Sequence, residues 1–198
     1  MNVDTFNITF MELNNIHESA KVLSIAMLQN PLHIAALKGN GESQRVKIES
    51  MFIDLFNKLP GMTFIAKEDK KIVGVMRMKS CCGQKLEENR KEQKIENEID
   101  NRIATWHREW ALRDPAEQHW HLDPIGVLPS HRGLGIGSRL MKLFCKEVDK
   151  CSANAFLETD LDENVLFYKK FGFEVVSKSN IFDVECRYMA RTVQKQTN

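Results

Sequence analysis

The chain has 198 residues, 42% of them hydrophobic and 8% aromatic, which can bury one substantial core but hardly two, so we expect a single domain over residues 1–198. Its 28 Lys and Arg residues nearly balance its 27 Asp and Glu residues, which leaves no overall basic field to hold nucleic acid or an anionic membrane. A charged ligand must therefore be bound by a local site.

The cysteines argue against a disulfide framework and against a zinc ribbon, because their number is odd and no two have CxxC spacing. We expect reduced, mostly packed thiols in a cytoplasmic protein. The first ten residues lack a basic segment followed by an apolar one, and no apolar run approaches the roughly 20 residues that a membrane helix requires. The sequence thus predicts a soluble, unexported protein. The cysteines are Cys81, Cys82, Cys145, Cys151 and Cys186.

The first third of the chain predicts a strand and then two helices. Residues 5–11 alternate as in a strand, whereas apolar side chains recur at helical spacing over 13–27 and again over 48–59. The pair Pro60-Gly61 ends the second helical pattern, because both residues disfavour a helix interior.

A hairpin and a helical insertion follow. Residues 62–67 and 72–78 are rich in strand-forming residues on either side of a polar turn, which predicts an antiparallel pair. Residues 84–101 are dense in Glu, Lys, Asn and Gln, but apolar residues at helical spacing from Ile95 to Trp110 form one apolar stripe. We therefore expect a solvated helical insertion at about 84–112 rather than a disordered linker.

Strands and helices alternate in the remainder of the chain. A strand over 118–127 leads through a glycine-rich loop into a helix with one apolar face. A further strand, a short helix and a closing pair of strands are expected at 153–159, 164–171, 173–177 and 182–190. The order predicts an α/β fold with a twisted mixed sheet of about six or seven strands flanked by helices.

The glycine-rich loop stands where a strand leads into a helix, so backbone amides and the positive helix end can converge there on phosphate oxygens. It lacks the Gly-Lys-Ser or Gly-Lys-Thr of a P-loop, which disfavours ATP and GTP. Its GxGxG spacing is a poor dinucleotide fingerprint, so a nucleotide-cofactor oxidoreductase is a weaker alternative, as is a plain glycine-rich turn. The loop residues are Arg132, Gly133, Leu134, Gly135, Ile136, Gly137 and Ser138.

The segment from Val127 to Gly137 resembles the acetyl-CoA pyrophosphate loop of the GNAT superfamily, Q/R-x-x-G-x-G/A after a strand that ends in Val-x-Pro. A second signature of that superfamily, an Asn, a Tyr four residues later and then Gly-Phe, resembles the segment from Asn164 through Tyr168 to Phe173. The two signatures occur in the expected order, and the resemblance extends over residues 62–191.

Within the superfamily, residues 120–127 and 156–159 are most similar to the branch that contains puromycin N-acetyltransferase, which also carries a helical insertion before the loop strand. The resemblance implies a GNAT fold and transfer of an acetyl group from acetyl-CoA to a primary amine of a small molecule by direct attack. Separately from the resemblance, we expect no metal, no nucleic-acid or membrane partner, and a monomer or homodimer. A non-catalytic acyl-CoA-binding or sensor module is the alternative.

The resemblance also implies roles for individual residues. The pantetheine arm would pair with the backbone of Ile125, Gly126 and Val127, and the Val127 amide would stabilise the developing oxyanion. Asn164 would hold the pantetheine amide or the thiol region. Tyr168 would be the general acid, since a phenol with a pKa of about 10 stays protonated at neutral pH, the alternative being a tyrosine that caps the core.

His119, His121 and Asp123 alternate along the expected strand, which places them on one face. His121 is a candidate base, acting directly or through water, and Glu158 on the neighbouring strand is the competing base or the anchor of the substrate cation. The sequence leaves that choice open. The His-x-His-x-Asp pattern is also a possible zinc ligand set, but without a cysteine or an acidic partner cluster we expect solvated strand-face histidines.

Overall fold

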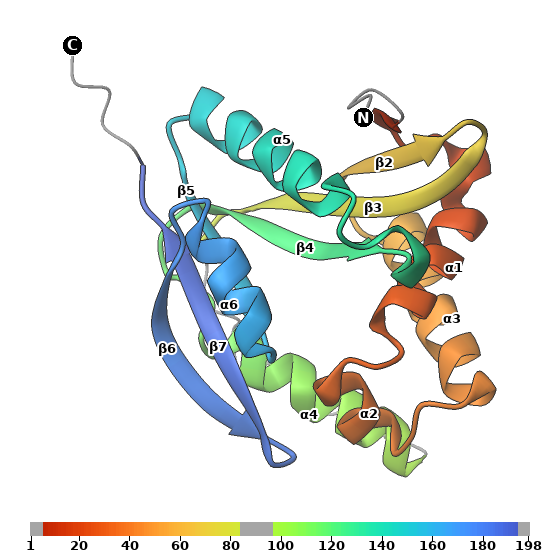
Figure 1. The fold of residues 1–198 in the computed structure, drawn as a ribbon. Helices are drawn as coiled ribbons and strands as arrows, with labels where there is room; N and C mark the ends of the chain where they lie inside the picture. The colour runs from red at the N-terminus through yellow and green to blue at the C-terminus, as the bar shows by residue number, and fades with distance from the viewer. Residues whose placement is uncertain (1–5, 84–96, 194–198) are drawn as a thin grey trace.

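The computed structural model describes residues 6–83 and 97–193. In these residues seven strands form one twisted sheet in the order β1-β2-β3-β4-β5-β7-β6 (Figure 1). Only β4 and β5 run parallel, so the sheet is mixed, as predicted. The strands are β1 (Phe6–Phe10), β2 (Met62–Glu68), β3 (Lys71–Cys81), β4 (His119–Val127), β5 (Asn154–Thr159), β6 (Glu174–Ile181) and β7 (Val184–Arg191).

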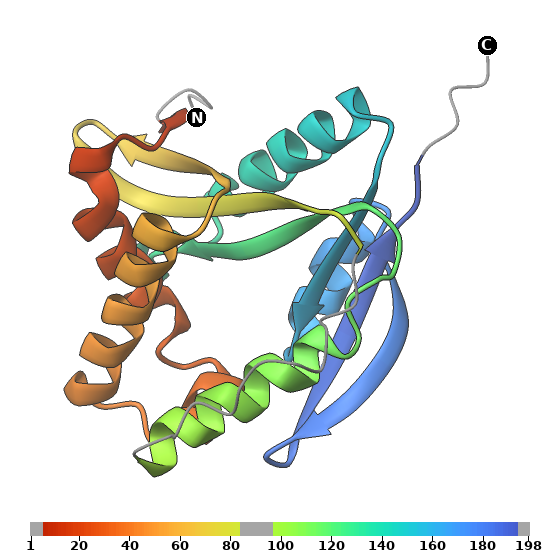
Figure 2. The ribbon, with the colours of Figure 1, turned by 180° about the vertical axis from the view of Figure 1, so that it is seen from behind.

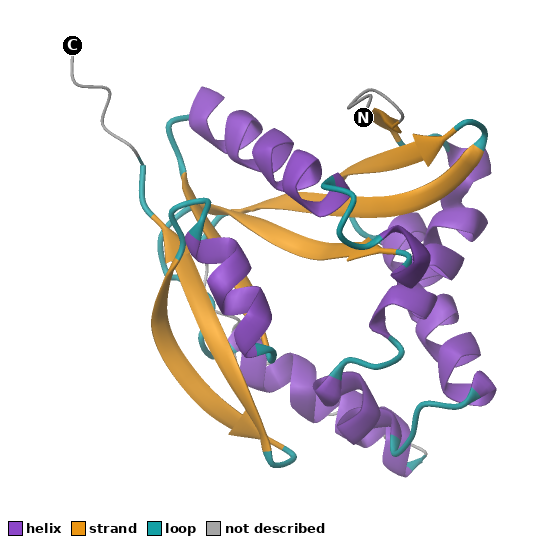
Figure 3. Cartoon of the chain, in the orientation of Figure 1, coloured by secondary structure: helices purple, strands orange, loops and turns teal. Residues whose placement is uncertain are grey.

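Helices cover both faces of the sheet (Figure 3). Seen from behind, α3 and α4 lie in front of the sheet, while α5 and α6 lie beyond it (Figure 2). Among the described residues no helix is both long and apolar enough to cross a membrane. The helices are α1 (Ile16–Met27), α2 (Pro31–Leu37), α3 (Glu42–Lys58), α4 (Glu98–Ala111), α5 (Ile136–Lys150) and α6 (Asp162–Lys169).

Two glycines let helices approach the central strands closely from opposite sides. A Cβ added at Gly74 of β3 would lie 2.9 Å from Cγ2 of Ile136 at the start of α5. A Cβ added at Gly126 of β4 would lie 2.9 Å from Cδ2 of Leu23 in α1. Helices α1 and α5 therefore enclose β3 and β4 between them, and either added methyl group would push a helix away.

The parallel pair β4 and β5 separates part of the way along. Register pairs join His119, Trp120 and His121 to residues 154–156, and no further pair continues toward Val127. On its other side β4 stays paired with β3 as far as Val127. The second half of β4 thus presents a backbone edge that no described strand occupies. The place where the pairing of β4 with β5 stops is called the opening between β4 and β5 below.

The structure corrects several details of the sequence analysis. Helix α2 was not predicted, because seven residues opening with Pro31 show too little periodicity, although Asn30 caps it by accepting from the His33 amide. Helix α3 begins at Glu42, six residues before the first apolar position of the expected pattern. In the expected insertion, α4 accounts for Glu98–Ala111, whereas residues 84–96 lie outside the described part of the chain.

All five cysteines are free, as predicted, and three of them are buried or half-buried. Cys186 alone among the five is buried, whereas Cys82 and Cys151 are exposed. The reason is position: Cys82 follows the end of β3, and Cys151 stands in the turn after α5. A third, Cys81, is half-buried beside two histidines, and its surroundings are described below.

Candidate active site

The glycine loop forms an open anion-binding turn at the start of α5. Gly133 and Gly135 have φ of +79° and +81°, a left-handed conformation that side-chain-bearing residues rarely adopt. Gly135 is the N-cap of α5, and the first turn of the helix contains no acidic side chain. Residues 132–135 are exposed, so the unpaired amides of the first helical turn are accessible to phosphate oxygens.

Arg132 fixes this loop to the rest of the fold. One of its guanidinium nitrogens, Nη2, donates to the main-chain carbonyl of Ala26, near the end of α1, at 3.1 Å. The contact joins the loop to the helix that packs on the opposite face of β4. Arg132 therefore contributes chiefly to the geometry of the loop. Its guanidinium also places a positive charge beside the glycine residues of the loop.

At the free edge of β4, the amide of Val127 is directed into the opening between β4 and β5. The Leu128 amide donates to the Val73 carbonyl of β3 at 2.9 Å. Successive amides of an extended chain point to opposite sides, so the Val127 amide is directed toward β5. The same alternation directs the Ile125 amide that way. These groups supply the unpaired hydrogen-bonding positions that an extended ligand requires.

Helix α6 brings the second sequence signature to the glycine loop. A Cβ added at Gly137 would lie 3.7 Å from Cζ of Phe167, so the first turn of α5 touches α6. The next residue, Tyr168, is 6% exposed and packs edge-on against Phe173. Burial, together with the charge of Asp160, raises the pKa of Tyr168 above 10, which keeps the phenol protonated.

Asn164 lies one helical turn before Tyr168 and is half-buried. The spacing of four residues places the two side chains on the same side of α6. Gly172 ends the turn after the helix with φ +84° and leads directly into Phe173 of the core. The contact at Phe167 thus places α6, which carries Asn164 and Tyr168, against the first turn of α5.

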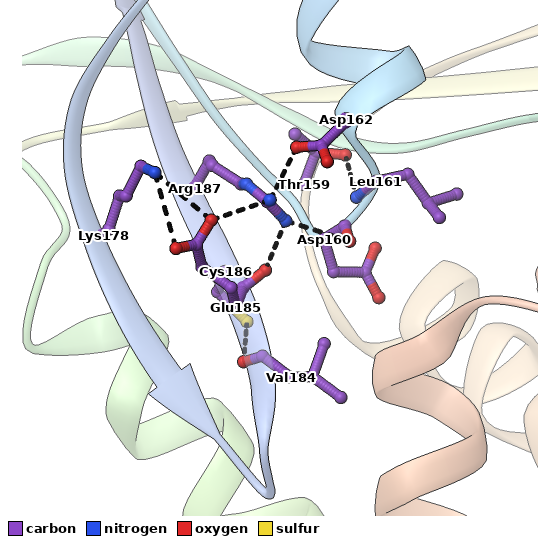
Figure 4. Close-up of polar contacts among 9 residues, drawn as sticks. All are labelled: Thr159, Asp160, Leu161, Asp162, Lys178, Val184, Glu185, Cys186 and Arg187. Atoms are coloured by element: carbon purple, nitrogen blue, oxygen red, sulfur yellow. Dashed lines mark hydrogen bonds and ion pairs between the residues drawn. The ribbon is translucent and has the colours of Figure 1, made fainter.

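The connection between β5 and α6 is held in place by β7 (Figure 4). Arg187 donates to the Asp160 carbonyl at 3.2 Å and pairs with the Asp162 carboxylate at 2.6 Å. It also pairs with Glu185, which in turn binds Lys178. These contacts anchor the start of α6, and so they fix the position of the signature residues further along the helix.

His121 and Glu158 meet on the opposite face of the sheet from Tyr168. His121 Nε2 lies 2.8 Å from Glu158 Oε2, and the two side chains are 9% and 4% exposed. Phe156, which contacts the His121 ring, packs with Trp106 of α4, whereas Tyr168 belongs to the core beneath α5. Burial lowers the pKa of His121, but the Glu158 charge and the neighbouring Asp114 and Cys81 raise it well above 6.5.

The expectation of solvated histidines was wrong. Taken as whole residues, His119 is 1% exposed and His121 is 7% exposed. The ring of Phe156 lies edge-on to both imidazoles, with centroid separations of 5.7 and 5.6 Å. Asp123 does not join them, since its carboxylate pairs with Arg77 at 2.8 Å and Lys79 at 3.4 Å.

Two residues that the sequence analysis did not select stand beside these histidines. Asp114 Oδ1 lies 3.3 Å from His119 Nε2 and from His121 Nδ1. Cys81 stands opposite His119 in the β3–β4 register. Burial lowers the pKa of His119, but Asp114 and Cys81 raise it to about 9. The sequence marks these two residues only weakly as functional. Asp114 is part of an Asp-Pro pair in a loop, and Cys81 stands at the end of a strand pattern.

An open hollow of about 680 Å³ lies elsewhere, along the C-terminal half of α5 and the turn after α6. Its lining includes Lys142, Lys146 and Arg191 but none of the residues selected above. The candidate site is instead the place where β4 and β5 separate, with the free backbone edge of β4 there, Tyr168 on one face of the sheet and Glu158 on the other.

Comparisons with known proteins show the family of this chain. The family model described as acetyltransferase (GNAT) family matches residues 28–173. The uncharacterized N-acetyltransferase YjcF of Bacillus subtilis is 34% identical over 74 residues, which cover 37% of this chain and 51% of the relative. The sequence match therefore spans about half the length of that relative.

Solved structures share the fold at low sequence identity. One described as histone acetyltransferase HPA2 and related acetyltransferase, from Corynebacterium glutamicum, has a TM-score of 0.71 at 15% identity and covers 98% of this chain and 99% of its own. A GNAT family acetyltransferase from Brucella melitensis, in complex with acetyl-CoA, has a TM-score of 0.55 at 15% identity, with 98% and 91% covered. Because the family model spans well over half of the chain, this protein belongs to the acetyltransferase (GNAT) family.

Proposed function

We propose that this protein transfers the acetyl group of acetyl-CoA to a primary amine of a small molecule by direct attack. The observation that supports the proposal most is the free backbone edge of β4 where its pairing with β5 stops; the glycine loop follows this strand, and Tyr168 lies on α6, which packs against the start of α5. Each of these three features supplies one requirement of the reaction, namely alignment of the thioester, phosphate binding and a proton for the leaving group.

The diphosphate of acetyl-CoA binds the amides of residues 133–138 at the start of α5. From there the pantetheine arm runs along the backbone of Ile125, Gly126 and Val127, taking the place of a neighbouring strand. The Val127 amide then faces the thioester oxygen and stabilises the negative charge that develops on it. Asn164 lies close to the thiol end of the arm, where its side-chain amide can bind the pantetheine.

The chemistry needs one group that accepts a proton and one that donates a proton. The amine nitrogen bonds to the thioester carbonyl carbon and forms a tetrahedral intermediate, and the C–S bond then breaks. Glu158 takes the proton, or holds the positive charge, of the amine. Tyr168 gives its hydroxyl proton to the sulfur as CoA leaves, so no free thiolate has to enter solvent.

Of the two candidate bases, we assign this role to Glu158 and give His121 a positioning role. His121 Nε2 lies 2.8 Å from Glu158 Oε2, so the imidazole holds the carboxylate from behind. The side chain of Glu158 is 4% exposed, and a carboxylate so recessed suits a slender primary amine better than a broad macromolecular surface. This favours a small-molecule acceptor, as does the resemblance to the branch that contains puromycin N-acetyltransferase.

Two alternatives make different predictions. A non-catalytic acyl-CoA sensor would bind acetyl-CoA without acceptor-dependent release of CoA. A nucleotide-cofactor oxidoreductase would bind NAD(P) in preference to acetyl-CoA. Calorimetric titration with each cofactor separates the second alternative from the proposal, and a turnover assay separates the first.

Gly135→Asp is expected to weaken acetyl-CoA binding on the order of 10 to 100-fold, because a carboxylate at the helix N-cap repels the diphosphate. An added Cβ at this position meets no atom within 4 Å, so lack of space does not explain a loss. Gly135→Asn is the matched control, since Asn tolerates a positive φ as Asp does and has nearly the same shape. Equal affinities of the two variants in calorimetric titration would place the diphosphate elsewhere.

A further inference from the structure

The end of β3, the start of β4 and the loop before β4 bring two overlapping groups of possible metal ligands together on the face covered by α4: Cys81 with His119 and His121, and Asp114 with His121 and Glu158. Cys81 of β3 stands opposite His119 of β4, and His121 follows two residues later on the same face. The candidate ligand atoms of these three residues all lie within 4.8 Å of one another. Asp114, from the loop, lies 3.3 Å from one nitrogen of each imidazole.

The second ring nitrogen of each histidine is already bound. His119 Nδ1 lies 2.9 Å from the Glu117 carbonyl oxygen, which can only accept a hydrogen bond, so Nδ1 carries the proton. His121 Nε2 is held in the same way by the Glu158 carboxylate at 2.8 Å. In the neutral rings, the lone pairs are therefore on His119 Nε2 and His121 Nδ1, the two nitrogens that face Cys81 and Asp114. A carbonyl or carboxylate behind each imidazole is the arrangement that metal-ligating histidines use.

The two inward-facing nitrogens have no other partner. Both are buried, and neither makes a hydrogen bond to any described residue, although Asp114 Oδ1 is near enough for one. The contacts of these nitrogens with Asp114 Oδ1 are short enough for hydrogen bonds, but their directions do not suit hydrogen bonds. Ligand atoms arranged tetrahedrally around an ion with bonds of about 2.0 to 2.3 Å stand roughly 3.3 to 3.8 Å apart, and their lone pairs point at the ion instead of at one another.

We propose that Cys81, His119, His121 and Asp114 bind a divalent transition-metal ion, with Zn²⁺ as the best match. One thiolate, two imidazoles and one carboxylate form the borderline-soft, tetrahedral donor set that zinc prefers over magnesium or calcium. Four protein ligands leave no open position, so the ion is structural. It ties the end of β3 and the loop before β4 to β4 itself.

Gly83 supports the same geometry from outside the ligand set. It has φ +75°, and a Cβ added there would lie 2.2 Å from the Ala116 carbonyl oxygen. The backbone after β3 therefore lies directly against the loop that carries Asp114. This close approach brings Cys81 and Asp114 to the same pair of histidines although 33 positions separate them in the numbering.

The inference departs from the expectation that no metal is involved, which depended on the apparent lack of a cysteine or acidic partner for the histidines. It does not rest on the proposed function, because metal binding is measured without acetyl-CoA or acceptor. The ion would hold His121 through Nδ1, and His121 in turn holds Glu158 through Nε2. Loss of the metal would then affect the position of the proposed base.

The test measures metal bound to the untagged full chain after incubation with Zn²⁺ and dialysis. Wild type and Cys82→Ser are expected to retain about one zinc per chain. Cys81→Ser and His119→Ala are expected to retain less than about a tenth of that, because each removes one of four ligands. Cys82 is the matched control, since it is the neighbouring cysteine and is exposed. Equal zinc contents in wild type and Cys81→Ser, or none in wild type, would overturn the proposal.

Cobalt substitution tests the ligand set on the same proteins. Wild type with Co²⁺ is expected to show tetrahedral visible absorption and a thiolate-to-cobalt charge-transfer band, and Cys81→Ser is expected to lose that band. Should the variants fail to fold, X-ray absorption at the zinc edge of wild type decides: one sulfur and three nitrogen or oxygen ligands support the proposal. Coordination without sulfur contradicts it.

Discussion

Replacing Tyr168 by phenylalanine is expected to lower the turnover of the folded enzyme by about 10²–10⁴-fold, the usual contribution of general acid catalysis. The substitution keeps the ring and its packing against Phe173 and removes only the hydroxyl. The affinity for acetyl-CoA should therefore stay within about twofold, so the loss appears in kcat rather than in binding. Turnover per active site and a calorimetric titration on one preparation measure both quantities.

The other tyrosine of the chain supplies the control. Tyr188 is fully buried, and its hydroxyl shares a 2.8 Å hydrogen bond with Ser179. Tyr188→Phe should lower the free energy of unfolding by about 1 kcal/mol and leave the turnover of folded molecules unchanged. If Tyr168→Phe behaves in the same way, with a lower melting temperature and normal turnover, Tyr168 caps the core and is not the acid.

Glu158→Gln is expected to reduce turnover by about 10²–10⁴-fold, since the amide can neither take the proton of the amine nor compensate its charge. Glutamine keeps the length of the side chain and an oxygen that can accept from His121, so the structure around it should persist. The effect should appear in kcat/KM for the amine, with acetyl-CoA affinity unchanged.

Glu174→Gln is the matched control for this charge removal. Glu174 lies on β6, its side chain is 71% exposed, and among the described residues it pairs with Lys169 alone, across a solvated surface. An exposed pair of this kind contributes little to stability, and the position is remote from the opening between β4 and β5. Equal turnover of the two variants would remove Glu158 from the reaction and leave the proton to water.

Local patterns predicted the elements that form the proposed cofactor site. Gly133 and Gly135 can be predicted from sequence because a positive φ at a strand-to-helix turn favours glycine, and both have a positive φ there. The strand at residues 118–127 and the helix after the loop follow from apolar periodicity, and β4 and α5 confirm them within a few residues. Asn164 and Tyr168 were selected by a spacing that α6 preserves.

The surroundings of the histidines could not be predicted in the same way. That His119 and His121 are buried depends on Phe156 and on the packing of α2 and α4, contacts between residues distant in sequence. Strand alternation predicted that Asp123 shares a face with the two histidines. Its carboxylate instead forms ion pairs with Arg77 and Lys79. Cys81 comes close to the two histidines through the register of β3 and β4, and Asp114 through the path of the loop before β4. Neither can be derived from local sequence patterns.

The most direct test of the account measures thiol release from acetyl-CoA in the presence of a panel of small primary amines, with the product mass determined for each. The account predicts acceptor-dependent release of one CoA per acetylated amine with at least one member of the panel, and loss of that release in Tyr168→Phe. Acetyl-CoA that binds tightly at the glycine loop but is released no faster with any amine than with water alone would contradict it, and the protein would then be an acyl-CoA-binding module.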